Sequence, residues 1–134
     1  MKTRVLDCWA ILEWISERHG AGRTVAAILS QAEAGQMRLI MSAINAGEVH
    51  YFLLKDHKGM LAEKWRRTSG ALPITIETPT LEDIWEAAVL KGGFRISYAD
   101  AFAAALARKH SCPLVTGDPE FRSVDDLELH WIGR

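Results

Sequence analysis

The stretch that decides the fold is ISYADAFAAALARKHSCPLVTGDPEF, residues 96 to 121. Asp100 stands three residues after a serine, a spacing that begins helices. Residues 101 to 107 are apolar on every side, which predicts a helix that is buried all round. Residues 114 to 116 then form a short apolar strand, which ends at Asp118 in a Gly-Asp-Pro turn. One acid therefore opens a buried helix, and a second follows the next strand, at the edge where open α/β sheets bind ligands.

Strands and helices alternate along the rest of the chain. Short apolar runs predict strands at residues 4–6, 38–41, 73–76 and 127–131. Apolar residues at helical spacing predict the helices between them. The first helix starts at Trp9 and is broken by Gly20 and Gly22, and the second runs through Val25 to Gly35. Ser42 caps the third, and a short fourth helix covers 59–69. The fifth runs from a Thr80–Asp83 capping pair to Gly92-Gly93. Such alternation implies right-handed crossovers and an α/β fold. We expect a single domain over residues 1–134, a three-layer α/β/α sandwich with a mainly parallel sheet of about five strands.

Composition limits the possible classes of protein. The formal charge is −1, so nucleic-acid binding requires a local basic patch. The two cysteines lack zinc-type spacing, which favours a reduced chain in the cytoplasm. The longest apolar run has seven residues, too few to cross a bilayer, and Asp7 interrupts the first apolar stretch. We therefore expect no membrane partner and no signal peptide.

Four acids are candidates for one site. Asp7 ends the first strand, Asp100 opens the buried helix, and Asp118 follows the strand after it. Glu48 shares a helix face with Ile44 and with Tyr51 and Phe52, a face expected to point inward. A buried carboxylate is costly unless it is paired or bound to a metal. Four oxygen ligands at one sheet edge suit Mg²⁺ or Mn²⁺.

Each acid also has a simpler explanation. Asp7 and Asp118 fit turn positions, and Asp100 fits the acid of a helix-capping box. Glu48 fits an ion pair with an arginine or histidine, or an exposed position if its helix is rotated. These explanations are independent of one another, and all would have to hold together. Three acids at strand or helix ends plus one on an apolar helix face therefore favour a site.

Four segments carry a resemblance to a known family. They are VLDCWAIL at 5–12, SAINAGEVHY at 42–51, ISYADAFAAALA at 96–107 and PLVTGDPEF at 113–121. In this order they resemble the PIN-domain ribonucleases, specifically the toxin half of bacterial VapBC-type toxin–antitoxin pairs. The resemblance covers essentially the whole chain.

The resemblance implies an activity, a site and partners. It implies Mg²⁺- or Mn²⁺-dependent cleavage of RNA, with the metal held by Asp7, Glu48, Asp100 and Asp118, and a homodimer inhibited by a cognate antitoxin. Thr116 matches a polar residue that the family often places before its last acid, and Ser97 and Asn45 are further supporting polar residues. One departure is that Cys8 and Trp9 follow the first acid, where many members carry serine or threonine.

Basic and aromatic residues suggest further contacts. Lys64, Arg66 and Arg67 are expected on the outer side of the 59–69 helix, where a solvated face is favoured over contact with RNA phosphates. On the inner side of that helix we expect Leu61 and Trp65. The tryptophan and histidine predictions concern faces rather than chemistry. Trp85, in a stripe with Leu81, Ile84, Ala88 and Val89, and Trp131 are expected in the core. Trp9, Trp14 and Trp65 fit the core or a partner surface. The five histidines, His19, His50, His57, His110 and His130, are expected to be structural or exposed.

Two rival functions remain. A phosphatase on a doubly wound fold needs a nucleophilic aspartate with a second acid two residues later, but Trp9 occupies that place after Asp7. A non-catalytic PIN-like module that binds RNA or protein would keep the fold without the chemistry. Loss of one of the four acids would have favoured the module, and all four are present.

Overall fold

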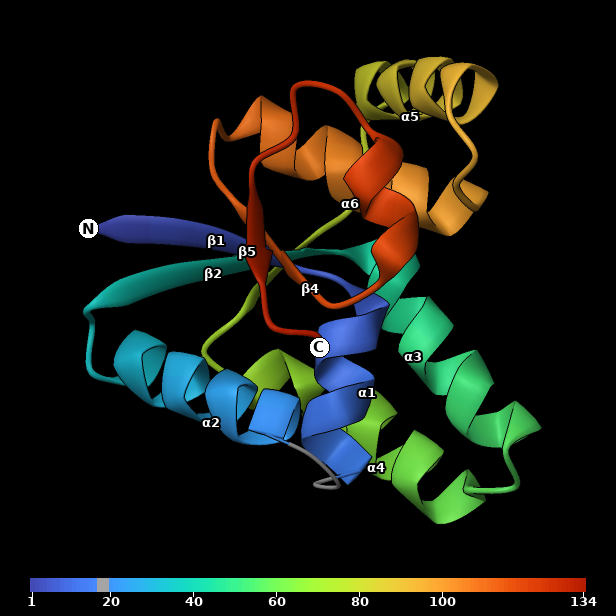
Figure 1. The fold of residues 1–134 in the computed structure, drawn as a ribbon. Helices are drawn as coiled ribbons and strands as arrows, with labels where there is room; N and C mark the ends of the chain where they lie inside the picture. Colours follow the sequence, from blue (N-terminus) through green and yellow to red (C-terminus); the bar gives the residue numbers. More distant parts are fainter. Residues whose placement is uncertain (17–19) are drawn as a thin grey trace.

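We describe the protein from a computed structural model, which covers residues 1–16 and 20–134. Figure 1 shows the sheet and the helices that connect its strands. The strands are β1 (Lys2–Leu6), β2 (Met37–Ser42), β3 (Thr75–Glu77), β4 (Leu114–Thr116) and β5 (Leu129–Trp131). The helices are α1 (Cys8–Ser16), α2 (Gly20–Glu33), α3 (Ala43–Lys55), α4 (Gly59–Thr68), α5 (Leu81–Gly93) and α6 (Tyr98–Lys109), with 3-10 turns η1 (Ser69–Ala71) and η2 (Pro119–Ser123).

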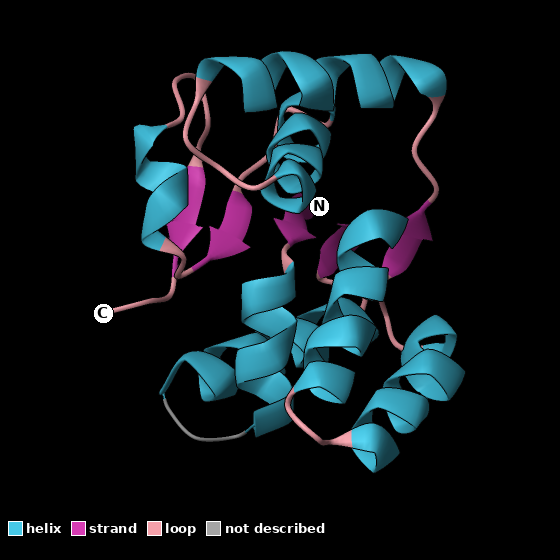
Figure 2. Ribbon diagram, turned by 90° about the vertical axis from the view of Figure 1, so that its right-hand side faces the viewer, coloured by secondary structure: helices cyan, strands magenta, loops and turns pink. Residues whose placement is uncertain are grey.

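The five strands form one parallel sheet with the order β3-β2-β1-β4-β5. Leu6 pairs with Val115, so the end of β1 lies beside the end of β4. Figure 2 shows the strands between two layers of helices, and Figure 1 shows α5 and α6 on one side of the sheet and α1 to α4 on the other. The predicted three-layer α/β/α fold is therefore confirmed.

Two apolar cores lie on the two faces of the sheet. Successive strand residues point to opposite faces, so Val5 and Leu114 join the core under α5 and α6, while Leu6 and Val115 join the core under α1 to α4. All seven residues from 101 to 107 are buried, as their uniform apolarity predicts. Many of them are alanines, and these small side chains allow α6 to lie close to the strands. That rigid contact fixes the position of Asp100 in the first turn of α6.

Several predicted boundaries and faces are wrong. Gly22 does not break a helix: it lies inside α2, where an added Cβ would come within 2.6 Å of the Glu13 carbonyl oxygen. This glycine permits close contact between α1 and α2. The apolar stripe of α5 was expected to be buried, but Leu81, Trp85 and Val89 are 60%, 55% and 70% exposed. α5 instead buries Ala87 and Leu90 against α6.

Two other aromatic or apolar residues differ from their predicted positions. Leu61 was expected to face inward but is exposed, whereas Trp65 is buried and donates a hydrogen bond from Nε1 to the Ala46 carbonyl at 2.8 Å. Trp131 was expected in the core but is only partly buried, because β5 is an edge strand. His19 lies outside the described residues. Among the described helices, none is both long and apolar enough to cross a membrane.

Candidate metal centre

The candidate site lies at the carboxyl ends of β1 and β4. These neighbouring strands are the point where the strand order reverses: the connection after β1 crosses one face of the sheet, and the connection after β4 crosses the other. Open α/β sheets bind ligands at such a point because the two diverging connections leave a crevice there. Asp7 directly follows β1, and Asp118 follows β4 after one glycine.

Thr116 joins these two acids through hydrogen bonds. Its buried hydroxyl donates to Oδ2 of Asp7 and accepts from the backbone N–H of Asp118 at 3.0 Å. The second oxygen of Asp7, Oδ1, accepts from the N–H of Ala10 in the first turn of α1 at 2.8 Å. Both carboxylate oxygens of Asp7 are therefore held in place, and each retains a lone pair that faces no described donor.

Asp100 stands where a capping-box acid would stand, but it does not act as one. Ser97 caps α6 by accepting from the Asp100 backbone N–H at 3.0 Å. In α5 the equivalent acid, Asp83, returns a bond to the backbone N–H of its cap residue, Thr80, at 2.9 Å. No such return bond from Asp100 to Ser97 exists in the described structure. The Asp100 carboxylate thus takes no part in the cap.

The Asp100 carboxylate instead lies with two other acids. Carboxylate oxygens of Asp100, Asp118 and Glu120 lie within 4.8 Å of one another. Glu120 is not among the acids predicted from the sequence. The signal was present, because Glu120 follows Asp118 by two residues at the start of η2, where the Asp118 carboxylate accepts from the Glu120 backbone N–H at 3.0 Å. This turn brings the two side chains together.

Glu48 reaches the same region from α3. The buried stripe of α3 consists of Asn45, Val49 and Leu53, with Glu48 at its edge, so the helix is rotated from the predicted face; Ile44 and Tyr51 are exposed. Asn45 donates from Nδ2 to Glu48 Oε1 at 3.3 Å and to the Ala99 carbonyl at 3.0 Å. Since Ala99 precedes Asp100, this amide fixes α3 against the start of α6.

Burial and crowding raise the pKa values of Asp7, Glu48 and Asp100. Burial, followed by repulsion from Asp118, Glu48 and Asp7, raises the pKa of Asp100 from 3.8 to about 8. Burial is also the main cause that raises the pKa of Asp7 to about 7, although its bonds from Thr116 and Ala10 oppose the shift. The pKa of Glu48 rises for the same first reason, burial. Repulsion from the Asp118 carboxylate adds to the upward shift of all three pKa values.

Cys8 occupies the place where the resembling family often has a hydroxyl. Burial raises the pKa of its thiol, and Glu48, Asp7 and Asp100 add repulsion. The thiol stays protonated and hydrogen-bonds to Glu48, which lowers the Glu48 pKa. The Cys8 thiol therefore donates to the Glu48 carboxylate. The hydroxyl that donates to Asp7 comes from Thr116.

The residues fit a divalent cation. The donor set consists of carboxylate oxygens, the ligands that Mg²⁺ and Mn²⁺ prefer. In addition, Oδ1 of Asn45 is buried without a hydrogen-bond partner in the described structure, although its amide holds Glu48. A cation among these oxygens would favour their ionised forms and offset the repulsion that raises their pKa values.

The predicted basic contacts lie apart from this cluster. Lys64, Arg66 and Arg67 are exposed on α4, as expected, and Arg66 and Arg67 pair with Glu63 at 2.7 and 3.9 Å. They do not belong to the acid cluster. Among the described histidines, His110 pairs with Glu77, with 3.1 Å between Nε2 and Oε1. Neither residue belongs to the acid cluster.

Comparisons with known proteins bear on the fold and the family. The family model described as PIN domain matches residues 4–127. No curated protein matches the sequence.

Solved structures share the fold at low identity. A chain of VapBC2 from Rickettsia felis, bound to a promoter DNA fragment, is 17% identical with a TM-score of 0.74, over 96% of this chain and 97% of that one. A chain of DNA-bound VapBC from Salmonella typhimurium is 14% identical with a TM-score of 0.74, over 98% and 99%. VapC20 from Mycobacterium tuberculosis, a toxin that cleaves the sarcin-ricin loop, is 17% identical with a TM-score of 0.68, over 89% and 92%.

These structures establish the fold alone, whereas the family match covers most of the sequence and includes Asp7, Glu48, Asp100 and Asp118. The chain belongs to the PIN domain family.

Proposed function

We propose that the protein is an Mg²⁺- or Mn²⁺-dependent endoribonuclease and the toxin component of a type II toxin–antitoxin pair. The observation that carries this proposal is the Asp100 carboxylate, which is free of its helix cap and lies with Asp118 and Glu120 within 4.8 Å. A helix cap or a turn explains neither the burial of this carboxylate nor its closeness to two other acids. Fold relatives that are VapBC toxin–antitoxin proteins support the same class of function.

In this proposal Asp7, Asp100 and Asp118 hold the cation directly, and Glu48 holds it directly or through water. The bound cation polarises the scissile phosphate and lowers the pKa of a water molecule. The chain's own residues orient the donors: Thr116 fixes Asp7, and the Asn45 amide fixes Glu48. Glu120, from η2, is a further donor at the exposed side of the cluster.

The partners follow from the same proposal. The substrate is RNA, and the inhibitor is a cognate antitoxin, which places a basic side chain near the acids. We assign the homodimer contact to α5, where Leu81, Trp85 and Val89 form an exposed apolar stripe. Cys8 and Cys112 are both free thiols, in keeping with a reducing cytoplasm.

The test is a cleavage assay on total RNA with the purified chain, free of copurified protein, in Mg²⁺, Mn²⁺ or EDTA. We expect cleavage with either metal, none with EDTA, and a loss of at least about 100-fold in rate for Asp118→Asn. Asp126→Asn, on an exposed turn outside the cluster, serves as the matched control. A parent protein that cuts no RNA with either metal would favour the alternative, a non-catalytic PIN-like module that binds RNA or protein.

A further inference from the structure

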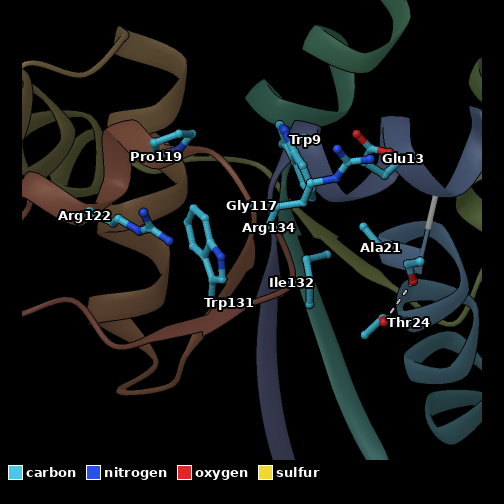
Figure 3. A pocket seen from close by; sticks show the side chains of 12 residues that line it. Trp9, Glu13, Ala21, Thr24, Gly117, Pro119, Arg122, Trp131, Ile132 and Arg134 are labelled. Carbon is cyan, nitrogen blue, oxygen red and sulfur yellow. Dashed lines mark hydrogen bonds between the residues drawn. The ribbon is translucent and has the colours of Figure 1, made fainter. Parts of the chain in front are cut away.

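A large open pocket lies next to the acid cluster. Its volume is about 830 Å³, and α1, the start of α2, η2 and the segment from β5 onward form its walls. Figure 3 shows Trp131 and Arg122 on one wall and Trp9 and Arg134 on the other. The proposed metal centre does not use these four side chains.

The pocket begins where the acid cluster ends. Trp9 is two residues from Asp7, and Gly117 and Pro119, which line the pocket, flank Asp118. Consecutive Cα atoms are about 3.8 Å apart, so the nearest wall is within about 8 Å of both acids along the chain. The Trp9 ring is seated directly on the turn, since a Cβ on Gly117 would come within 2.3 Å of it. The glycine therefore allows an indole to stand beside Asp118.

The pocket combines aromatic rings with positive charge. The Arg122 guanidinium lies 3.9 Å from the centre of the Trp131 ring, a cation–π distance. Nε1 of Trp131 is buried and has no hydrogen-bond partner within the described residues. The charged side chains that line the pocket are Arg122, Arg134 and Glu13, which together carry a charge of +1 beside a strongly acidic cluster.

This combination matches the chemistry of an unpaired nucleotide. Aromatic rings stack on nucleobases whatever their sequence, and arginines pair with the adjoining phosphates. An apolar protein segment would gain little from two arginines. An unpaired nucleotide offers a base to the aromatic rings and a phosphate to the guanidinium groups.

We propose that this pocket, resting on the proposed ribonuclease function, holds one unpaired nucleotide of the RNA next to the scissile phosphate. The base stacks on Trp131, with Trp9 on the opposite wall, and Arg122 and Arg134 contact backbone phosphates. Bases inside a duplex are already stacked and paired, so they do not enter without unpairing.

The test measures RNA binding in EDTA, so that it does not depend on cleavage. The probes are a fluorescent octa-adenylate RNA and the same ribose-phosphate chain without bases, each titrated by anisotropy. For the parent protein, removal of the bases is expected to weaken binding roughly 5- to 150-fold, the range of one stacked base. For Trp131→Leu, octa-adenylate binding falls by a similar factor, and removal of the bases then has little further effect. Trp131→Phe, which keeps a ring, retains most of the affinity.

Arg122→Gln tests the phosphate contact separately. It is expected to weaken both probes equally and to reduce the slope of log affinity against log salt by about 0.7. The matched control for Trp131→Leu is Trp14→Leu. Trp14 is also partly buried, but it lines a different pocket with Trp65. Thermal melts of every variant confirm that each is folded.

Three results would overturn the assignment: no RNA binding by the parent, equal affinity of the parent for the two probes, or a base contribution that Trp131→Leu leaves intact. Equal affinity for the two probes would show that the pocket binds no base and would favour a protein partner as its occupant. The proposed nuclease function is tested by metal-dependent cleavage, so either proposal can fail while the other stands.

Discussion

Asp100→Asn is the substitution that best separates a metal ligand from a helix cap. The cap of α6 uses the Ser97 hydroxyl and the backbone N–H of residue 100, at 3.0 Å, and neither changes. Asparagine has nearly the size of aspartate, so the buried contacts of the first turn remain. Only the ability to ionise is removed.

The magnitude follows from the pKa of Asp100. Burial, then repulsion from neighbouring carboxylates, raises this pKa from 3.8 to about 8. The unfolded chain loses the proton near pH 3.8, whereas the folded protein keeps it until about pH 8, so metal-free stability falls as pH rises through this window. Up to pH 7 the ceiling is about 4 kcal/mol, and solvent screening at the open side reduces our expectation to about 2 kcal/mol.

Asparagine has no proton to lose, so the variant escapes this cost. In EDTA at pH 7 we expect Asp100→Asn to be more stable than the parent by about 2 kcal/mol, and at pH 4 by about zero. For a chain of this size 2 kcal/mol corresponds to a rise in Tm of roughly 6–10 °C. The same variant should lose Mg²⁺ binding by calorimetry and nearly all cleavage.

The assay is a series of thermal melts in EDTA between pH 4 and 8, with Asp83→Asn as the matched control. Asp83 has the same position in α5, but its carboxylate caps Thr80 and pairs with Lys109 at 3.2 Å, and the backbone bond first of all lowers its pKa. Its contribution is present above pH 3.8 and is lost as pH falls through its lowered pKa. Asp83→Asn should therefore destabilise by about 0.5 kcal/mol at pH 7.

The two variants thus move stability in opposite directions at pH 7. If Asp100→Asn lowers the metal-free Tm at pH 7 as Asp83→Asn does, then Asp100 is not a crowded carboxylate, and the reasoning is refuted. A folded Asp100→Asn protein that cuts RNA as fast as the parent would equally end the metal-site proposal.

Four other predictions follow from the same contacts. Thr116→Val removes the bonds to Asp7 and to the Asp118 N–H, so melts should show a loss of about 1–3 kcal/mol; an unchanged Tm would mean that these bonds are unimportant. Mg²⁺ binding should release protons and tighten as pH rises from 6 to 8, since the pKa values of Asp7 and Asp100 are about 7 and 8; equal calorimetric enthalpies at pH 7 in buffers of different ionisation enthalpy would contradict this. Glu120→Gln should weaken Mg²⁺ affinity but shift the Tm by only about 1 °C, because Glu120 is exposed; an affinity equal to that of the parent would exclude it as a donor. Trp85→Glu should convert a dimer to a monomer by light scattering, and a variant that stays dimeric would move the contact away from α5.

Features that depend on local sequence were predictable. The α6 helix is buried because residues 101 to 107 are apolar in every direction, so no rotation exposes a polar side. The Thr80–Asp83 capping box needs only residues three apart, and it forms as predicted. The order of strands and helices was predictable because each element has its own period of apolar residues. That order predicts the three-layer arrangement.

Features that depend on what lies opposite a residue were not predictable. The buried stripe of α3 contains Asn45, which a simple apolar pattern treats as exposed; its partners, Glu48 and the Ala99 carbonyl, come from the same helix and from another segment. The apolar stripe of α5 faces outward because α5 packs on α6 through a different side, which carries Ala87 and Leu90. Glu120 joins the acids only through the turn of η2, which no helical or strand period describes.

The bond from Thr116 to Asp7 spans 109 residues of sequence. β1 leaves the ribosome well before its neighbour β4, so β1 has β2 beside it long before its other edge is covered. During synthesis, at about 5–20 residues per second, the chain therefore carries Asp7 for several seconds before its partner exists. The acid cluster assembles last, and a ribosome-bound fragment that ends before β4 holds no complete centre. In the proposed ribonuclease, this order of assembly delays activity until β4 has joined the sheet beside β1.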